Sequence, residues 1–265
     1  MTREHVLFEC DGSTLAGTLD RAEGAVGILI VSGGNEIRSG AFAGQSRLAR
    51  IIASRAYPVF RFDRRGVGDS EGMNGGFRSS APDIAAALSC FREQCPHIER
   101  VVAFGNCDAA SALMLLGGAG FDARVLANPW TFDDESAGEM PADLVRSRYA
   151  RKLADPAEWK RLLTGGVSLA KLAKGLVRST RRAVPMSGLG QEMHSAMSGY
   201  EGSVRYLVAG RDRTGMAFKA AWPGADEIAV NSSADHGFSA MQDREWLERE
   251  LLSVLEEQAR QLDMG

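Results

Sequence analysis

The residues best suited to chemistry in this chain are a cysteine, an aspartate and a histidine, each placed beside a turn. Cys107 follows shortly after the apolar run Val101–Phe104 and precedes a run of small residues typical of a helix. Asp212 lies just past the hydrophobic run Val204–Ala209, and His236 stands in a polar stretch before the last amphipathic segment. A thiol, an imidazole and a carboxylate acting together can carry out nucleophilic acyl transfer.

The sequence around Cys107 predicts a strand, a sharp turn and a helix, in that order. Gly105 and Ala109 supply the small residues that such a crowded turn needs on both sides of a nucleophile. The turn is expected to raise the Cys107 side chain above the edge of the sheet, at a helix N-terminus. Because that end of a helix carries partial positive charge, it favours the thiolate form of a thiol.

Other residues compete for the acid and base roles. Asp235 adjoins His236, but side chains of adjacent residues rarely orient each other in a line, so Asp212 is the preferred acid. Asp212 could instead be only a helix N-cap, and His236 only a loop histidine. The other histidines are predicted at the start of a strand, after a helix and in an inserted segment, where the last could touch substrate: His5, His97 and His194.

Attack on a carbonyl creates an oxyanion, which needs two backbone N–H donors. The turn itself offers the N–H of Asp108. The second donor is expected from Ser32-Gly33-Gly34-Asn35, a glycine-rich turn after the run Val26–Val31. Gly34 and Asn35 are the candidates there. The same turn could be a phosphate loop, but the Gly-Lys-Ser/Thr that completes such a loop is missing.

Composition indicates a globular, soluble protein. The chain has 265 residues, 45% of them hydrophobic, which is enough for a large core. The charged N-terminal residues lead straight into a strand-like segment, and no apolar run is long enough to span a bilayer, so we expect a cytoplasmic protein. The other cysteines lack the spacing of a zinc site, and neither a metal nor a cofactor is expected: Cys10, Cys90 and Cys95.

Hydrophobic patterning predicts an α/β fold with a mostly parallel central sheet flanked by helices. Two alternating runs joined through Asp11-Gly12-Ser13 indicate an antiparallel hairpin. Continuous apolar runs, typical of strands buried on both faces, alternate with amphipathic stretches. The predicted buried strands are Val26–Val31, Pro58–Phe62, Val101–Phe104, Arg124–Ala127 and Val204–Ala209, and the predicted helices are Arg47–Arg55, Pro82–Gln94, Ala109–Leu116 and Asp243–Leu262.

One interval breaks this alternation. Residues 131–202 show only helical patterning with Gly-rich turns, and we interpret them as a helical cap inserted into a core formed by residues 1–130 and 203–265. The net charge of −3 conceals an excess of about nine positive charges between Leu144 and Gly190. A solvated helical face explains such a segment; an anionic substrate, an acidic carrier protein or a membrane surface are the alternatives.

Further motifs carry a resemblance to known proteins. The loop Phe62–Gly72 resembles the Asp-x-Arg-Gly-x-Gly-x-Ser loop of α/β-hydrolases, and with the Cys107 turn and the ordered acid and histidine this resemblance covers nearly the whole chain. A narrower set of segments is similar to hydrolase 1 of the exosortase A-associated system, found in bacteria that make extracellular polysaccharide. These segments are Val31–Asn35, Gly105–Ser111, Trp159–Gly166 and Ala234–Ser239. The resemblance implies a cytoplasmic hydrolase of the α/β-hydrolase fold.

The sequence therefore favours a hydrolase of esters, thioesters or lactones with Cys107 as nucleophile, His236 as base and Asp212 as the acid that holds the base. The expected partner is a small acyl substrate or an acyl carrier. An acyltransferase that uses the same three residues is one alternative, and a non-catalytic scaffold that binds a pathway partner is another. Nothing in the sequence indicates nucleic-acid binding, and it does not define the oligomeric state.

Overall fold

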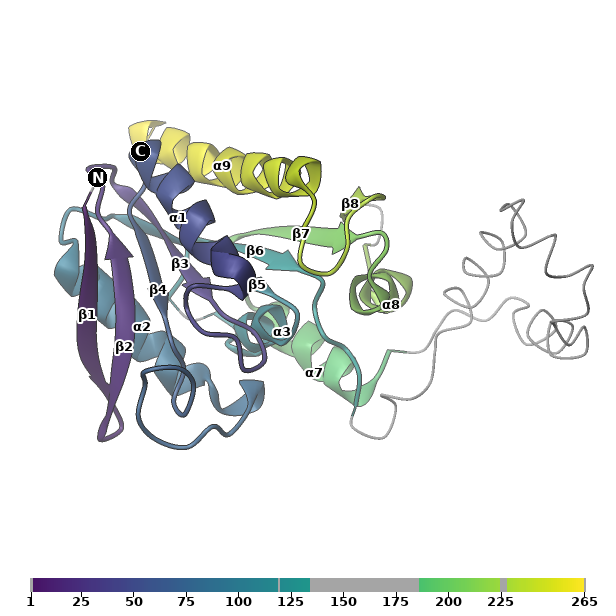
Figure 1. Cartoon of the computed structure of the whole chain (residues 1–265). Coiled ribbons are helices and arrows are strands. Elements are labelled where there is room, and N and C mark those ends of the chain that lie inside the picture. Colours follow the sequence, from purple (N-terminus) through teal and green to yellow (C-terminus); the bar gives the residue numbers. More distant parts are fainter. Residues whose placement is uncertain (1, 119, 134–185, 225–227, 265) are drawn as a thin grey trace, which may run out of the picture.

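The computed structural model describes residues 2–118, 120–133, 186–224 and 228–264 (Figure 1). All eleven lysines and arginines of the basic segment, and the part of the predicted cap from 134 to 185, lie outside the described residues. None of the helices in the described part is long and apolar enough to cross a membrane.

Eight strands of the described chain form one sheet in the order β1-β2-β4-β3-β5-β6-β7-β8. The six strands β4, β3, β5, β6, β7 and β8 run parallel to one another. At one edge, β2 pairs antiparallel with β4, and β1 pairs antiparallel with β2. The mostly parallel sheet that the hydrophobic runs predicted is thus confirmed. The bounds are β1 Arg3–Cys10, β2 Ser13–Asp20, β3 Val26–Val31, β4 Val59–Phe62, β5 Arg100–Asn106, β6 Ala123–Ala127, β7 Ser203–Ala209 and β8 Ala229–Asn231.

The predicted hairpin joins β1 to β2 through two residues. Asp11 and Gly12 both adopt positive φ, at 48° and 76°. Two successive left-handed residues define the tight turn whose twist matches that of the strands, and Asp-Gly is a preferred pair for it. The register then places Cys10 opposite Ser13 at the turn.

Helices cover both faces of the sheet (Figure 1). The helices α1 and α9 pack on one face, and α2, α3 and α7 pack on the other. The bounds are α1 Gly44–Ser54, α2 Ala81–Gln94, α3 Asp108–Leu115, α7 Gly188–Met197, α8 Arg213–Ala221 and α9 Met241–Met264, with short 3-10 helices η1 Ala41–Ala43 and η2 Phe77–Ser79.

Strand β5 shows how the sheet divides the core. Val102 and Phe104 face α1 and α9, whereas Val101 and Ala103 face the opposite layer. Alternate residues of a strand point to opposite faces, so a strand covered on both sides must be apolar throughout. This is why the continuous apolar runs of the sequence identify the central strands.

The strand order changes direction between β3 and β5. From β3 the chain proceeds through α1 to β4 on one side, and β5 lies on the other side of β3. Loops that leave the carboxyl ends of two such neighbouring strands diverge and open a crevice, where ligands bind in open α/β sheets. The Gly33–Asn35 turn follows β3 and Cys107 follows β5, so both candidate elements lie at this crevice.

Two elements of the C-terminal half were not expected from the sequence. Strand β8 has only three residues and is partly exposed, so its pattern is too short to recognise. Helix α8 begins directly after Asp212, at the residue that the sequence favoured as an acid. Within the range 131–202, the described helix α7 buries Leu189 and Met193 in the core layer that also contains α3.

Candidate active site

Cys107 occupies the sharp turn that its neighbours predicted. It has φ 62° and ψ −127° and is the N-cap residue of α3. A non-glycine residue with this backbone is strained by about 1–3 kcal/mol, which persists only where the surroundings enforce it. The Cys107 N–H donates to Ala127 O at 2.9 Å, which ties the turn to the end of β6.

Glycine is required next to this turn. A Cβ atom on Gly105 would lie 2.8 Å from the backbone of Ala109 and Ala110, a separation that real Cβ atoms do not show. Ala109 is fully buried where α3 begins. The small residues on both sides of Cys107 therefore serve close packing between β5 and α3, as a strand–turn–helix of this kind demands.

Asp212 and His236 are brought together although 24 positions separate them in the sequence. The Nδ1 atom of His236 lies 3.0 Å from Oδ2 of Asp212. The same Oδ2 accepts the N–H of Gly215 at 2.8 Å, so Asp212 is also the N-cap of α8. The two interpretations of Asp212 in the sequence, acid and helix cap, are thus compatible, because one carboxylate performs both tasks.

The local contacts set the charge states of this pair. Hydrogen bonds with Asp212 and then with Cys107 raise the pKa of His236 from 6.5 to about 10, and outweigh the opposing effect of burial. Burial by itself would raise the pKa of Asp212, but hydrogen bonds from His236 and Gly215 hold it below its ordinary value. The contact between Asp212 and His236 thus favours the carboxylate form of the acid and the imidazolium form that His236 adopts when it accepts a proton.

The competing residues have other partners. The Asp235 carboxylate accepts hydrogen bonds from the N–H and the hydroxyl of Ser239, and these contacts lower its pKa. His5 lies 3.4 Å from Thr18 Oγ1, and His97 contacts a backbone carbonyl. His194 packs its ring against Trp222, with ring centroids 5.5 Å apart. Among the four histidines, His236 is the one beside the candidate nucleophile.

The Gly33–Asn35 turn lies against the first turn of α3. The N–H of Gly34 donates to Oδ1 of Asp108 at 2.6 Å, so this donor is already engaged. The expectation that Gly34 offers a free N–H to an oxyanion is therefore not met in this conformation. Asn35, the other candidate, has no acceptor for its N–H among the described residues, and its side-chain oxygen accepts from Asn74 at 2.8 Å.

Arg64 fixes the orientation of the peptide group between Gly34 and Asn35. Its Nη2 donates to the carbonyl of Gly34, and its Nη1 donates to Ser80 Oγ at 2.8 Å. In a trans peptide the carbonyl and the following N–H point in opposite directions. By holding the Gly34 carbonyl, Arg64 therefore turns the Asn35 N–H away from itself and sets its direction.

The loop that carries Arg64 is the one that resembled an α/β-hydrolase signature. Asp63 is completely buried, and its carboxylate accepts the N–H groups of Arg38 and Asp69. Gly68 has φ 56° and packs directly on that carboxylate, where a side chain would collide. The motif is thus a support for the turn after β3 rather than a set of reacting groups.

Two asparagines that sequence reasoning did not single out hold the histidine loop. Asn106 Nδ2 donates to the carbonyl of His236 at 3.0 Å, and Asn128 Nδ2 donates to Asn106 Oδ1 at the same distance. Asn128 Oδ1 accepts the N–H of Ala209 at 2.8 Å. This clamp links the ends of β5, β6 and β7 to the loop that carries the imidazole. The sequence signal that could have identified them is an asparagine at the end of each of two buried strands, Asn106 at the end of β5 and Asn128 after β6.

Within the described residues, no group of three His, Cys, Asp or Glu side chains is arranged to hold a metal ion. All four cysteines are free, and Cys107 is the one that is not buried. Cys107, His236 and Asp212 have the side-chain types to act as nucleophile, proton carrier and orienting acid.

Comparison with solved structures identifies the architecture. An esterase of Pyrococcus furiosus superimposes with a TM-score of 0.62 and 14% identity, covering 97% of this chain and 91% of that one. A structure described as an alpha-beta serine hydrolase homologue from Coxiella burnetii gives 0.57 and 17%, covering 95% and 98%. Est1E from Butyrivibrio proteoclasticus, solved with ferulic acid, gives 0.58 and 12%, covering 96% and 98%.

No protein-family model and no curated protein matches the sequence. The likeness to solved structures extends over almost the whole chain, and the strand order and flanking helices agree with it. The chain has the α/β-hydrolase fold, as the sequence motifs predicted.

Proposed function

We propose that this protein hydrolyses acyl thioesters or activated esters through an acyl-enzyme intermediate on Cys107. The observation that carries the proposal is the contact of His236 Nδ1 with Asp212 Oδ2 at 3.0 Å, with Cys107 at the strand–turn–helix among the groups that raise the pKa of His236. Fold alone does not define an activity, so the proposal depends on this geometry. The named esterase and serine hydrolase homologue among the structural neighbours support the general class.

The first step forms the bond between sulfur and carbon. His236 takes the proton of the Cys107 thiol, because its contact with Asp212 favours the imidazolium that results. The thiolate attacks the substrate carbonyl, and the oxyanion that forms is stabilised by the N–H groups of Asp108 and Asn35. As the intermediate collapses, the bond to the leaving group breaks and His236 donates its proton to that group.

The second step releases the acyl group. His236 takes a proton from water, and the resulting hydroxide equivalent attacks the Cys107 thioester. Collapse breaks the carbon–sulfur bond, which yields the free acid and restores the thiol–imidazole pair. Asp212 keeps the imidazole in the tautomer and orientation required in both steps.

The identity of the nucleophile narrows the substrate. A thiolate leaves more readily than most alkoxides, so attack on an unactivated ester or amide tends to revert. Thioesters, aryl esters and strained lactones have leaving groups that compete with the Cys107 thiolate. Thioesterase or activated-ester hydrolase activity therefore ranks above lipase or peptidase activity. We also propose that the protein acts in a bacterial exopolysaccharide or exosortase system. This proposal is supported only by the four sequence segments that resemble hydrolase 1 of the exosortase A-associated system.

An aromatic pair lies in the segment that follows β6 and is joined by its backbone to the Cys107 turn. The backbone N–H of Trp130 donates to the backbone carbonyl of Cys107 at 3.3 Å. The rings of Trp130 and Phe132 meet edge to face, with centroids 4.9 Å apart. Apolar surface of this kind suits an acyl chain or an aromatic leaving group.

The test compares a thioester with the oxygen ester of the same acyl group in wild type, Cys107→Ala and Cys107→Ser. We expect hydrolysis of the thioester by wild type, loss of at least about 100-fold in both variants, and weaker turnover of the oxygen ester. Cys90→Ala is the matched control, because Cys90 is a buried thiol in α2 without a role in the site. Unchanged hydrolysis by Cys107→Ala would refute the proposal.

A further inference from the structure

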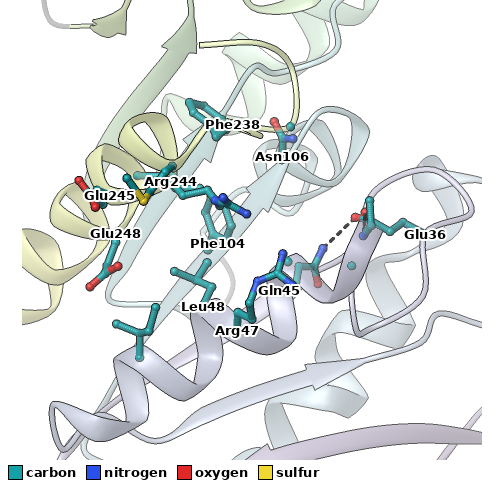
Figure 2. Close-up of a pocket in the computed structure, with 17 residues that line it drawn as sticks. Glu36, Gln45, Arg47, Leu48, Phe104, Asn106, Phe238, Arg244, Glu245 and Glu248 are labelled. Atoms are coloured by element: carbon teal, nitrogen blue, oxygen red, sulfur yellow. Dashed lines mark hydrogen bonds between the residues drawn. The ribbon is translucent and has the colours of Figure 1, made fainter. Parts of the chain in front are cut away.

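A second cavity lies between α1 and α9. It has a volume of about 450 Å³, within the range of small-molecule sites (Figure 2). Its walls come from α1 and the segment before it, from the end of β5, and from α9 with the two residues after His236. Cys107, His236 and Asp212 do not line it, although Asn106 and Gly237, their chain neighbours, do.

The interior of this cavity is largely apolar. Leu48 and Ile51 of α1 form one wall, and Leu247 of α9 forms the opposite one. Phe104 lies next to Leu48 in Figure 2 and Phe238 lies nearer Asn106, and both phenylalanines are at most 4% exposed. An aliphatic chain placed there would lose its contact with water, which is the main source of affinity for apolar groups.

Two arginines bring positive charge to the cavity from opposite sides. Figure 2 shows the guanidinium groups of Arg47 on α1 and Arg244 on α9 extending into the space between the helices. Arg47 Nη1 donates to the carbonyl of Phe42 at 2.6 Å, which leaves its other N–H groups available. In the part of the chain that the structure describes, the Arg244 guanidinium has neither an acceptor nor an ion-pair partner.

The acidic residues of the cavity limit the charge of a ligand. Glu36 is engaged by its own surroundings, because its carboxylate accepts the N–H of Ala41 at 2.6 Å and Gln45 Nε2 at 2.9 Å (Figure 2). Glu245 and Glu248 lie along α9 on the side away from Asn106. Three glutamates line the cavity against two arginines, so a ligand can carry at most one negative charge, placed at the two guanidinium groups and not along α9.

We propose that this cavity binds a small aliphatic carboxylate, with its head group between Arg47 and Arg244 and its chain along Leu48, Phe104 and Phe238. Guanidinium groups pair with carboxylates through two parallel hydrogen bonds, and the apolar wall holds the chain. The proposal is independent of the acyl-transfer chemistry, because it uses none of the three reacting residues.

The test is calorimetric titration of the purified protein with sodium octanoate and, separately, with 1-octanol. We expect one octanoate site per chain and binding of 1-octanol at least about tenfold weaker, because the alcohol cannot pair with the arginines. The double variant Arg47→Gln/Arg244→Gln should weaken octanoate binding by about tenfold or more. The matched control is Arg50→Gln/Arg249→Gln, which removes two exposed arginines from the same helices but outside the cavity.

Two further variants locate the ligand. Leu48→Trp fills the cavity and should abolish octanoate binding, with circular dichroism showing that the protein remains folded. Cys107→Ala should bind octanoate as wild type does. Equal affinity for 1-octanol, unchanged binding in the arginine double variant, or weaker binding in Cys107→Ala would each overturn the proposal.

Discussion

The carboxylate of Asp108 holds the N–H of Gly34 at 2.6 Å, which fastens the turn after β3 to the first turn of α3. The residue that follows Cys107 therefore contributes its side chain as well as its backbone. Gly33 passes so close to this carboxylate that a Cβ atom would lie 2.6 Å from Oδ1. Because this contact occupies the Gly34 N–H, it favours Asn35 as the proposed second oxyanion donor and Asp108 as the residue that positions it.

We expect Asp108→Ala to lower kcat about tenfold with little change in KM, because the turn that presents the Asn35 N–H loses its attachment. Asp108→Asn keeps an acceptor for Gly34 and should retain most of the activity. Steady-state kinetics on one thioester compares the two variants. If Asp108→Ala is as fast as wild type, the carboxylate blocks the Gly34 N–H instead of positioning the turn.

The backbone strain at Cys107 has a measurable effect on stability. Glycine adopts positive φ without a Cβ clash, whereas alanine keeps the strain. Cys107→Gly should therefore unfold with a free energy about 1 kcal/mol greater than Cys107→Ala, although glycine normally lowers stability. Urea denaturation of both variants measures this difference. A less stable glycine variant would show that the turn is not strained in solution.

The asparagine clamp should matter both for stability and for the rate. Asn128 is fully buried, and Asn128→Ala leaves the Ala209 N–H without an acceptor, so we expect a loss of about 2 kcal/mol in the free energy of unfolding. Asn106→Ala leaves the His236 carbonyl with only the longer hydrogen bond from Asn128 and should reduce kcat more than it reduces stability. A wild-type kcat in Asn106→Ala would contradict a role for the asparagine clamp in positioning His236.

The pH dependence of stability should report the His236–Asp212 pair. The pKa of His236 is raised from 6.5 to about 10 on folding, so its contribution is complete below about pH 6.5 and is lost as pH rises toward 10. The pKa of Asp212 is lowered, so its contribution is present above its ordinary value of 3.8 and is lost on further acidification.

The measurement is the free energy of unfolding of wild type and His236→Gln at pH 6, 8 and 10. The difference between the two proteins should shrink as pH rises. His97→Gln is the control, because that ring contacts only a backbone carbonyl. A difference that is constant or grows with pH would contradict the proximity of His236 to the Asp212 carboxylate.

Mutagenesis can distinguish Asp212 from Asp235 as the acid that orients His236. Asp212→Asn removes the charge that orients His236, and we expect kcat to fall by about 100-fold or more. Asp235→Asn changes the adjacent acid, whose carboxylate contacts Ser239 rather than the imidazole, and should stay within about threefold of wild type. Steady-state kinetics on one thioester measures kcat for both variants. A larger loss in Asp235→Asn would assign the orienting role to Asp235.

The sequence predicted the central sheet because strands buried on both faces must be continuously apolar, and it predicted the Cys107 turn because only small residues fit there. The hairpin followed from Asp11-Gly12 for a similar local reason. These features depend on near neighbours in the chain. The three residues of β8 and the partly exposed helix α8 carried too little pattern to recognise.

The remaining parts of the site depend on contacts between distant segments. Whether Gly34 or Asn35 presents a free N–H is decided by Asp108 and Arg64, 74 and 30 positions away from Gly34. Asn128 reaches the His236 carbonyl across 108 positions. Residue types alone cannot show which donor an acceptor captures, because the packing of the sheet ends determines it.

Intact-mass spectrometry after brief mixing with p-nitrophenyl acetate and with a short-chain acyl-CoA tests most directly whether Cys107 is the nucleophile. We expect one acyl adduct on wild type that peptide mapping places on Cys107, and no adduct on Cys107→Ala or His236→Ala. Cys90→Ala should acylate as wild type does. Acylation that persists in Cys107→Ala, or hydrolysis by wild type without any dependence on Cys107, would contradict the cysteine nucleophile.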